Sequence, residues 1–61
     1  MNKSQQREIA KLYCFYQIGM DDVVARGLSA LIRAALRQSQ VKLLMHYADA
    51  FGVRNHPEFL V

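Results

Sequence analysis

The sequence has little of what small proteins use to stabilise themselves without a partner. Its single cysteine, Cys14, excludes an intrachain disulfide. Cys14, His46 and His56 stand at no spacing typical of a structural zinc site. A chain of 61 residues is also small, since such a domain buries only about 60 % of the surface that its unfolded form exposes. A partner chain therefore remains as the source of additional stability.

Long apolar runs are absent as well. No segment approaches the roughly 18 consecutive apolar residues of a membrane span, and the opening "MNKSQQRE" lacks the apolar segment of a signal peptide. The lone cysteine is typical of a protein in a reducing compartment. These absences predict one soluble domain over residues 1–61, located in the cytoplasm and without a membrane partner.

The residue patterns of catalysis are missing too. The sequence has no paired carboxylates, no phosphate-binding glycine loop and no serine–histidine arrangement. Cys14 stands among large apolar residues, which favours a buried structural thiol over a nucleophile. His46 and Asp49 lie three residues apart, but a metal site needs more ligands, so both are expected on a solvated face. We therefore predict no enzyme, no metal, no cofactor and no small-molecule substrate.

What remains is a chain with little to interrupt a helix. Apolar residues recur at helical spacing and predict an all-α, small three-helix bundle, with helices at about 4–18, 21–37 and 40–51. Gly19 and Gly52 suit the left-handed positions that follow helix ends. Pro57 disfavours helix at the residue before it, so the chain should finish in a short extended tail.

The expected N-caps are Ser4 for the first helix, Asp21 or Asp22 for the second, and Ser39 for the third. Two alternatives remain open. The stretch "LYCFY" could form a strand, because it is short, aromatic and apolar. Residues 21–51 could also form a single bent helix.

Each of the first two helices has a predicted core stripe. On the first it comprises Ile9, Leu12, Tyr13, Tyr16 and Met20. On the second it comprises Val24, Leu28, Leu31, Ile32, Ala35 and Leu36. The second helix also has a small face, to which the backbone of another helix could approach closely. The residues of this small face are Val23, Gly27, Ala30 and Ala34.

The apolar content exceeds what three short helices can cover. It amounts to 52 % of the residues, and contiguous exposed apolar patches usually mark interfaces. The predicted protein interface comprises Phe15, Ile18, Val23, Gly27, Ala30, Ala34, Leu43, Phe59 and Leu60. We expect a non-enzymatic module that acts stoichiometrically, as a regulator, inhibitor or assembly factor. Its partner would be a larger protein or, in a homo-oligomer, a second copy.

An alternative function rests on the basic residues of the second helix. The net charge is +3, which is compatible with nucleic-acid binding. The segment "SALIRAALR" (Ser29 to Arg37) resembles the second helix of ribbon-helix-helix repressors, which implies a dimer that reads DNA with an N-terminal β-ribbon. The segment placed for that ribbon, "NKSQQRE", is polar and poor in strand formers. In this alternative, a DNA-binding regulator would contact nucleic acid, or an acidic partner, through Arg26, Arg33 and Arg37.

Overall fold

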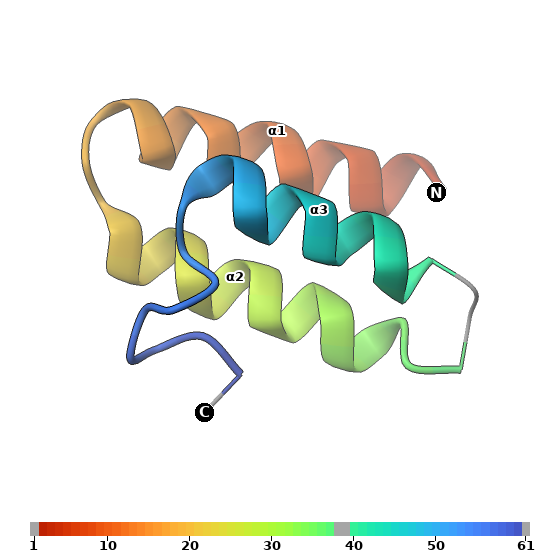
Figure 1. Ribbon diagram of the computed structural model, residues 1–61. Helices are drawn as coiled ribbons and strands as arrows, with labels where there is room; N and C mark the ends of the chain where they lie inside the picture. The colour runs from red at the N-terminus through yellow and green to blue at the C-terminus, as the bar shows by residue number, and fades with distance from the viewer. Residues whose placement is uncertain (1, 38–39, 61) are drawn as a thin grey trace.

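The described part of the chain folds into three helices. A computed structural model describes residues 2–37 and 40–60 of the chain. The helices are α1 (Lys3–Gln17), α2 (Asp21–Ala34) and α3 (Val41–Phe51). The direction of α2 is opposite to that of α1 and α3, and it packs against both (Figure 1). No strand occurs within the two described ranges. The all-α prediction is therefore confirmed, and "LYCFY" is helical.

The first helix is capped by a residue that was not predicted as its N-cap. The Asn2 side chain accepts a hydrogen bond from the Gln5 N–H at 2.8 Å, and the Gln5 side chain accepts one from the Asn2 N–H at 3.1 Å. This reciprocal pair is a capping box. The prediction of Ser4 was wrong, because the asparagine two residues earlier has a glutamine at the required spacing.

Replacing Asn2 by alanine should therefore lower the free energy of unfolding by about 1 kcal/mol, since the Gln5 N–H loses its side-chain acceptor. Ser4→Ala is the matched control and should change it by less than about 0.5 kcal/mol. Urea denaturation followed by circular dichroism measures both. Equal effects of the two substitutions would contradict the assignment of Asn2 as the cap.

Gly19 ends α1 as predicted. Its φ of +80° is left-handed, and the Gly19 and Met20 N–H groups donate to the carbonyls of Tyr16 and Phe15, each at 3.1 Å. The N-cap of α2 is Met20 and makes no side-chain cap bond, so the prediction of an aspartate cap was wrong. Asp21 and Asp22 instead occupy the first turn, where the positive end of the helix dipole favours them.

The break between α2 and α3 excludes the single bent helix. α2 ends at Ala34, three residues earlier than predicted, and α3 begins at Val41 with Gln40 as its N-cap. The predicted cap Ser39 lies outside the described residues. Leu36 follows the end of α2 and is 66 % exposed, so its assignment to the core stripe was wrong.

The core lies along α2, between the two helices that flank it. Leu28, Leu44, Val24 and Val53 have the largest apolar side chains that are completely buried. The buried apolar residues come from all three helices and from the start of the tail: Ile9, Leu12, Val24, Ala25, Leu28, Ile32, Ala35, Leu44, Ala48, Phe51 and Val53.

The tail folds back on the bundle in consecutive turns, which differs from the extended course predicted. The His56 N–H donates to the Val53 carbonyl and the Phe59 N–H to the His56 carbonyl, both at 2.9 Å. The Leu60 N–H donates to the buried Ser29 hydroxyl of α2 at 2.7 Å. With the chain folded back in this way, Phe59 packs against the core.

Candidate functional site

An apolar groove runs between α1 and α3. Both helices pack on α2 and make far less contact with each other, so the surface between them stays open over about 580 Å³. The described residues that line the groove come from α1 and α3, and their surface there is almost entirely apolar. Its lining residues are Gln6, Ile9, Ala10, Tyr13, Cys14, Tyr16, Tyr47, Ala50 and Phe51.

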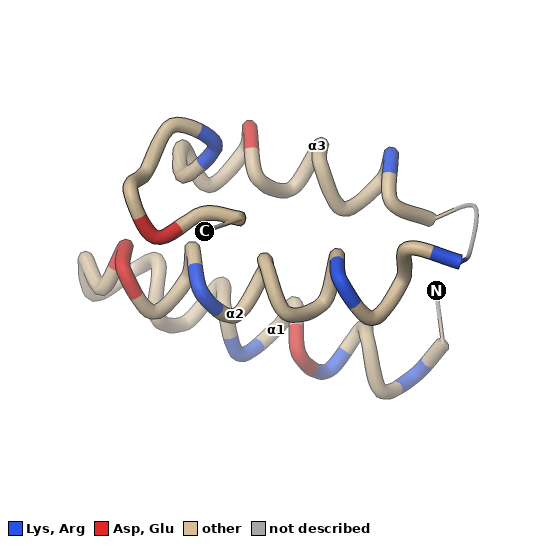
Figure 2. Tube along the Cα trace, turned by 90° about the horizontal axis from the view of Figure 1, so that it is seen from below, with Lys and Arg blue, Asp and Glu red and all other residues tan. Residues whose placement is uncertain are grey.

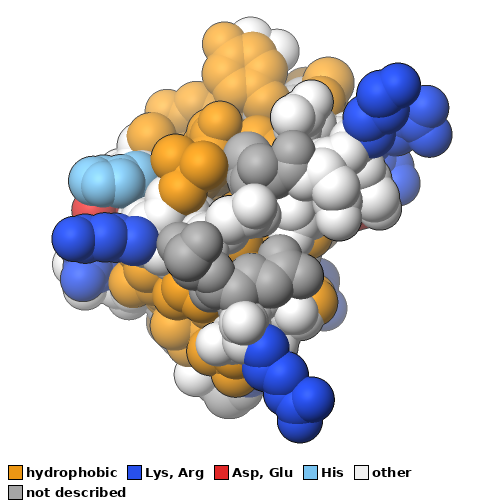
Figure 3. Space-filling model, turned by 90° about the vertical axis from the view of Figure 1, so that its right-hand side faces the viewer, with side chains coloured by type: hydrophobic (Ala, Val, Ile, Leu, Met, Phe, Trp, Pro, Cys, Tyr) orange, Lys and Arg blue, Asp and Glu red, His pale blue; other side chains and the backbone are white. Residues whose placement is uncertain are grey.

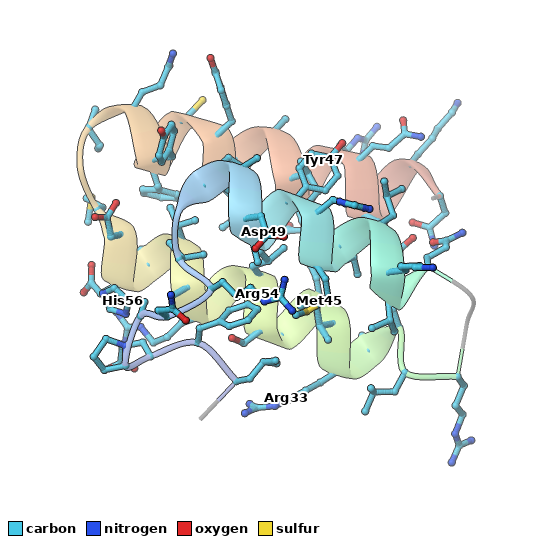
Figure 4. All side chains as sticks on the ribbon, in the orientation of Figure 1. Arg33, Met45, Tyr47, Asp49, Arg54 and His56 are labelled. Carbon is cyan, nitrogen blue, oxygen red and sulfur yellow. The ribbon has the colours of Figure 1, made fainter. Side chains whose placement is uncertain are left out.

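Four aromatic rings connect the two sides of this groove. The ring of Tyr16 lies 6.3 Å from that of Tyr13 and 5.3 Å from that of Phe51, which in turn lies 6.1 Å from that of Tyr47. Tyr47 lies on the edge of α3 nearest α1 (Figure 4). Tyr13 and Tyr16 remain 51 % and 40 % exposed. The two exposed tyrosines and the half-buried Tyr47 are therefore connected through the buried ring of Phe51.

The sequence placed these residues differently. Tyr13 and Tyr16 were predicted in the core stripe and Cys14 was predicted to be buried, yet all three are exposed. The reason is the rotation of α1 about its axis. Leu12 lies against Gly27 of α2, because glycine has no side chain and leaves room for it. The tyrosines therefore fall at the edge of the buried face. Met20, beyond the helix end, is 39 % exposed.

The predicted interface residues have several different surroundings. Phe15 and Phe59 pack against the core, and Gly27 faces Leu12 within the chain. Ile18 is 69 % exposed. The remaining ones are half-buried (Val23) or exposed (Ala30, Ala34, Leu43 and Leu60).

Leu43 lies one turn from the groove on α3. It is 43 % exposed and precedes Tyr47 by four residues, so the two share one face of the helix. None of the predicted interface residues is among the groove's lining residues. The aromatic residues of the groove were not predicted as surface groups. Their tyrosine hydroxyls were a usable signal, because such side chains favour half-exposed positions.

The predicted basic stripe lies on another side of the molecule. Arg26, Arg33 and Arg37 are all exposed, and α2 presents its basic positions in the view from below (Figure 2). Arg33 projects beneath α2, away from the edge that carries Tyr47 (Figure 4). Arg26 also forms an ion pair with Asp22 at 3.4 Å. This face is therefore separate from the groove.

The remaining candidate groups do not form a chemical centre. Asp49 pairs with Arg54 at 3.1 Å, and both His46 and Asp49 are exposed. The described part of the chain contains no cluster of three or more side chains suited to hold a metal ion. Among the described residues, no helix has the length and apolar character needed to cross a membrane.

Comparison of the chain with models of protein families, with curated proteins and with solved structures finds no match in any of the three. The groove and the arginines of α2 are the two surfaces from which a function can be inferred.

Proposed function

We propose that this protein is not an enzyme and acts by binding another protein stoichiometrically through the groove between α1 and α3. The observation that carries the proposal is the accessible aromatic surface of Tyr13, Tyr16 and the half-buried Tyr47, which lies over the buried ring of Phe51. Aromatic side chains are enriched at protein interfaces, where tyrosine supplies a large contact area at low conformational cost. Contiguous exposed apolar surface of this kind typically marks an interaction site.

The shape and chemistry of the groove favour a protein segment over a small ligand. Sites for small molecules usually combine an apolar cavity with a few converging polar groups that orient the ligand. Here the lining is almost wholly apolar. From Gln6 to Tyr16 the groove follows α1 for about 15 Å, the length of about three helical turns. An amphipathic helix seated there would pack on α1 and α3 together, as helices do in apolar grooves.

Cys14 provides a direct test, because it is exposed and lines the groove. A photo-crosslinker attached to it should give one defined adduct with a cellular protein at a 1:1 ratio. Tyr13→Ala should weaken that complex by about 30-fold, as expected for the loss of a central aromatic contact.

The matched control carries the same crosslinker on the exposed Ala30 of α2, as Ala30→Cys in a Cys14→Ser background. It should give no such adduct. An adduct formed from position 30 and not from position 14 would place the interface on the small face of α2 and overturn the proposed groove site.

Nucleic-acid binding is the alternative that the exposed Arg26, Arg33 and Arg37 favour. It predicts a binding affinity that depends strongly on salt, unlike apolar binding in the groove, because contacts with phosphates weaken steeply as the salt concentration rises. We expect the double substitution Arg33→Gln with Arg37→Gln to leave the crosslinked complex unchanged. Salt-sensitive binding of duplex DNA that this double variant abolishes would favour the alternative.

A further inference from the structure

The groove is bordered on the α1 side by basic side chains. Lys3 and Arg7 are exposed and lie one turn apart. They line a shallow hollow together with Gln6 and Ala10, and these two residues also line the groove. The positive charges of α1 are thus continuous with the edge of the apolar surface.

The α3 side carries the cation of Lys42 and the imidazole of His46, which can donate a hydrogen bond to a carboxylate. Lys42 and His46 are exposed and lie one turn apart. His46 is one further turn from Ala50, which lines the groove. Seen from the end of the bundle, hydrophobic side chains gather at the top of the molecule, and Lys, Arg and His side chains project on either side (Figure 3).

The acidic residues of these two helices do not offset that charge. Glu8 is the acidic residue of α1 and pairs with Lys11 at 3.4 Å. Asp49 is the acidic residue of α3 and pairs with Arg54 at 3.1 Å. Both edges of the groove therefore favour negative charge on whatever occupies it.

We propose that the occupant is an amphipathic helix of a different protein, with acidic residues on both sides of its apolar face. This inference rests on the proposed function and adds the charge of the partner. The apolar face would cover the aromatic residues, and the flanking carboxylates would lie near Lys3 and Arg7 on one side and Lys42 and His46 on the other. Such complementarity of charge speeds the encounter with a matching partner and disfavours binding of proteins with the wrong charge. A second copy docked groove to groove would bring the same basic edges together, which like-charge repulsion disfavours.

Two synthetic helical peptides test this charge preference. They share one apolar face and differ only in the flanking residues, which are glutamate in one and lysine in the other. Fluorescence anisotropy with the full chain at low salt should show the glutamate peptide binding about tenfold more tightly. Tyr13→Ala should weaken binding of the glutamate peptide, because the apolar face would lose a contact in the groove.

Charge reversal on one edge is the sharper measurement. The double substitution Lys3→Glu with Arg7→Glu should weaken binding of the glutamate peptide by about fivefold and strengthen binding of the lysine peptide. Arg33→Glu with Arg37→Glu makes the same change in net charge on α2, away from the groove, and should leave both affinities nearly unchanged. Equal responses to the two double reversals would show a general charge effect and overturn the inference.

The remaining outcomes separate this inference from the proposed function. Equal affinity for both peptides, lost in Tyr13→Ala, would keep the groove as a protein-binding site and overturn the acidic partner. Peptide affinities that Tyr13→Ala does not change would overturn both. Sedimentation showing a dimer that Tyr13→Ala dissociates would make a second copy the occupant and would also overturn the inference.

Discussion

Leu28→Ala should leave the chain largely unfolded at 25 °C. Leu28 is completely buried on α2, which packs against both other helices. Removing a buried leucine side chain costs about 2–5 kcal/mol, because apolar contacts are lost and a cavity remains. A core of this size rarely supplies more than about 3–5 kcal/mol of stability. The loss is thus comparable to the whole free energy of unfolding, and circular dichroism should show most of the helical signal gone.

Leu36→Ala is the matched control. The substitution is chemically identical, but Leu36 lies beyond the end of α2 and is 66 % exposed. It should change the free energy of unfolding by less than about 0.5 kcal/mol in urea denaturation. A loss at Leu36 as large as at Leu28 would show that α2 continues past Ala34 and buries this side chain.

The sequence was informative about the fold wherever a local signal has one structural meaning. Gly19 and Gly52 both adopt left-handed backbone conformations at the ends of helices, as their positions predicted. The predicted helices 21–37 and 40–51 likewise placed a break where α2 and α3 are separate. Such signals depend on only a few neighbouring residues, so they can be recognised without knowledge of the tertiary contacts.

The groove could not be predicted in the same way, because it depends on how α1 rotates about its axis. Periodicity placed Ile9 and Leu12 correctly in the core but assigned Tyr13 and Tyr16 to the same stripe. Their exposure depends on the close contact between Leu12 and Gly27, a pairing between helices that no local pattern encodes. The same limit applies to Cys14, whose apolar neighbours in sequence suggested burial.

The course of the tail depends on contacts distant in sequence as well. Pro57 and its neighbours predicted only that the helix had ended. The turns that follow bring Phe59 to the core and the Leu60 N–H to the Ser29 hydroxyl. Ser29 begins the segment that resembles the second helix of ribbon-helix-helix repressors. In the structure its hydroxyl is buried and also donates to the Ala25 carbonyl at 2.6 Å.

Gly27→Leu should destabilise the chain by about 1–2 kcal/mol, since overpacking a contact between helices typically costs about 1–3 kcal/mol. A Cβ at this position would lie 2.5 Å from Leu12 Cδ2, so Leu12 would have to move or α1 and α2 would have to separate. Leucine forms helix better than glycine by up to about 1 kcal/mol, which offsets only part of the loss. Urea denaturation provides the measurement.

Ala30→Leu, on the same small face as Gly27, shows whether this face packs within the chain or binds a partner. Ala30 is exposed, and alanine and leucine differ little in helix propensity, so stability should change by less than about 0.5 kcal/mol. Equal losses at positions 27 and 30 would mean that both lie against α1. If Ala30→Leu instead leaves the fold intact and abolishes the crosslinked complex, the small face of α2 is the interface. Binding through the groove requires that the complex persist in this variant, since Ala30 is not among the groove's lining residues.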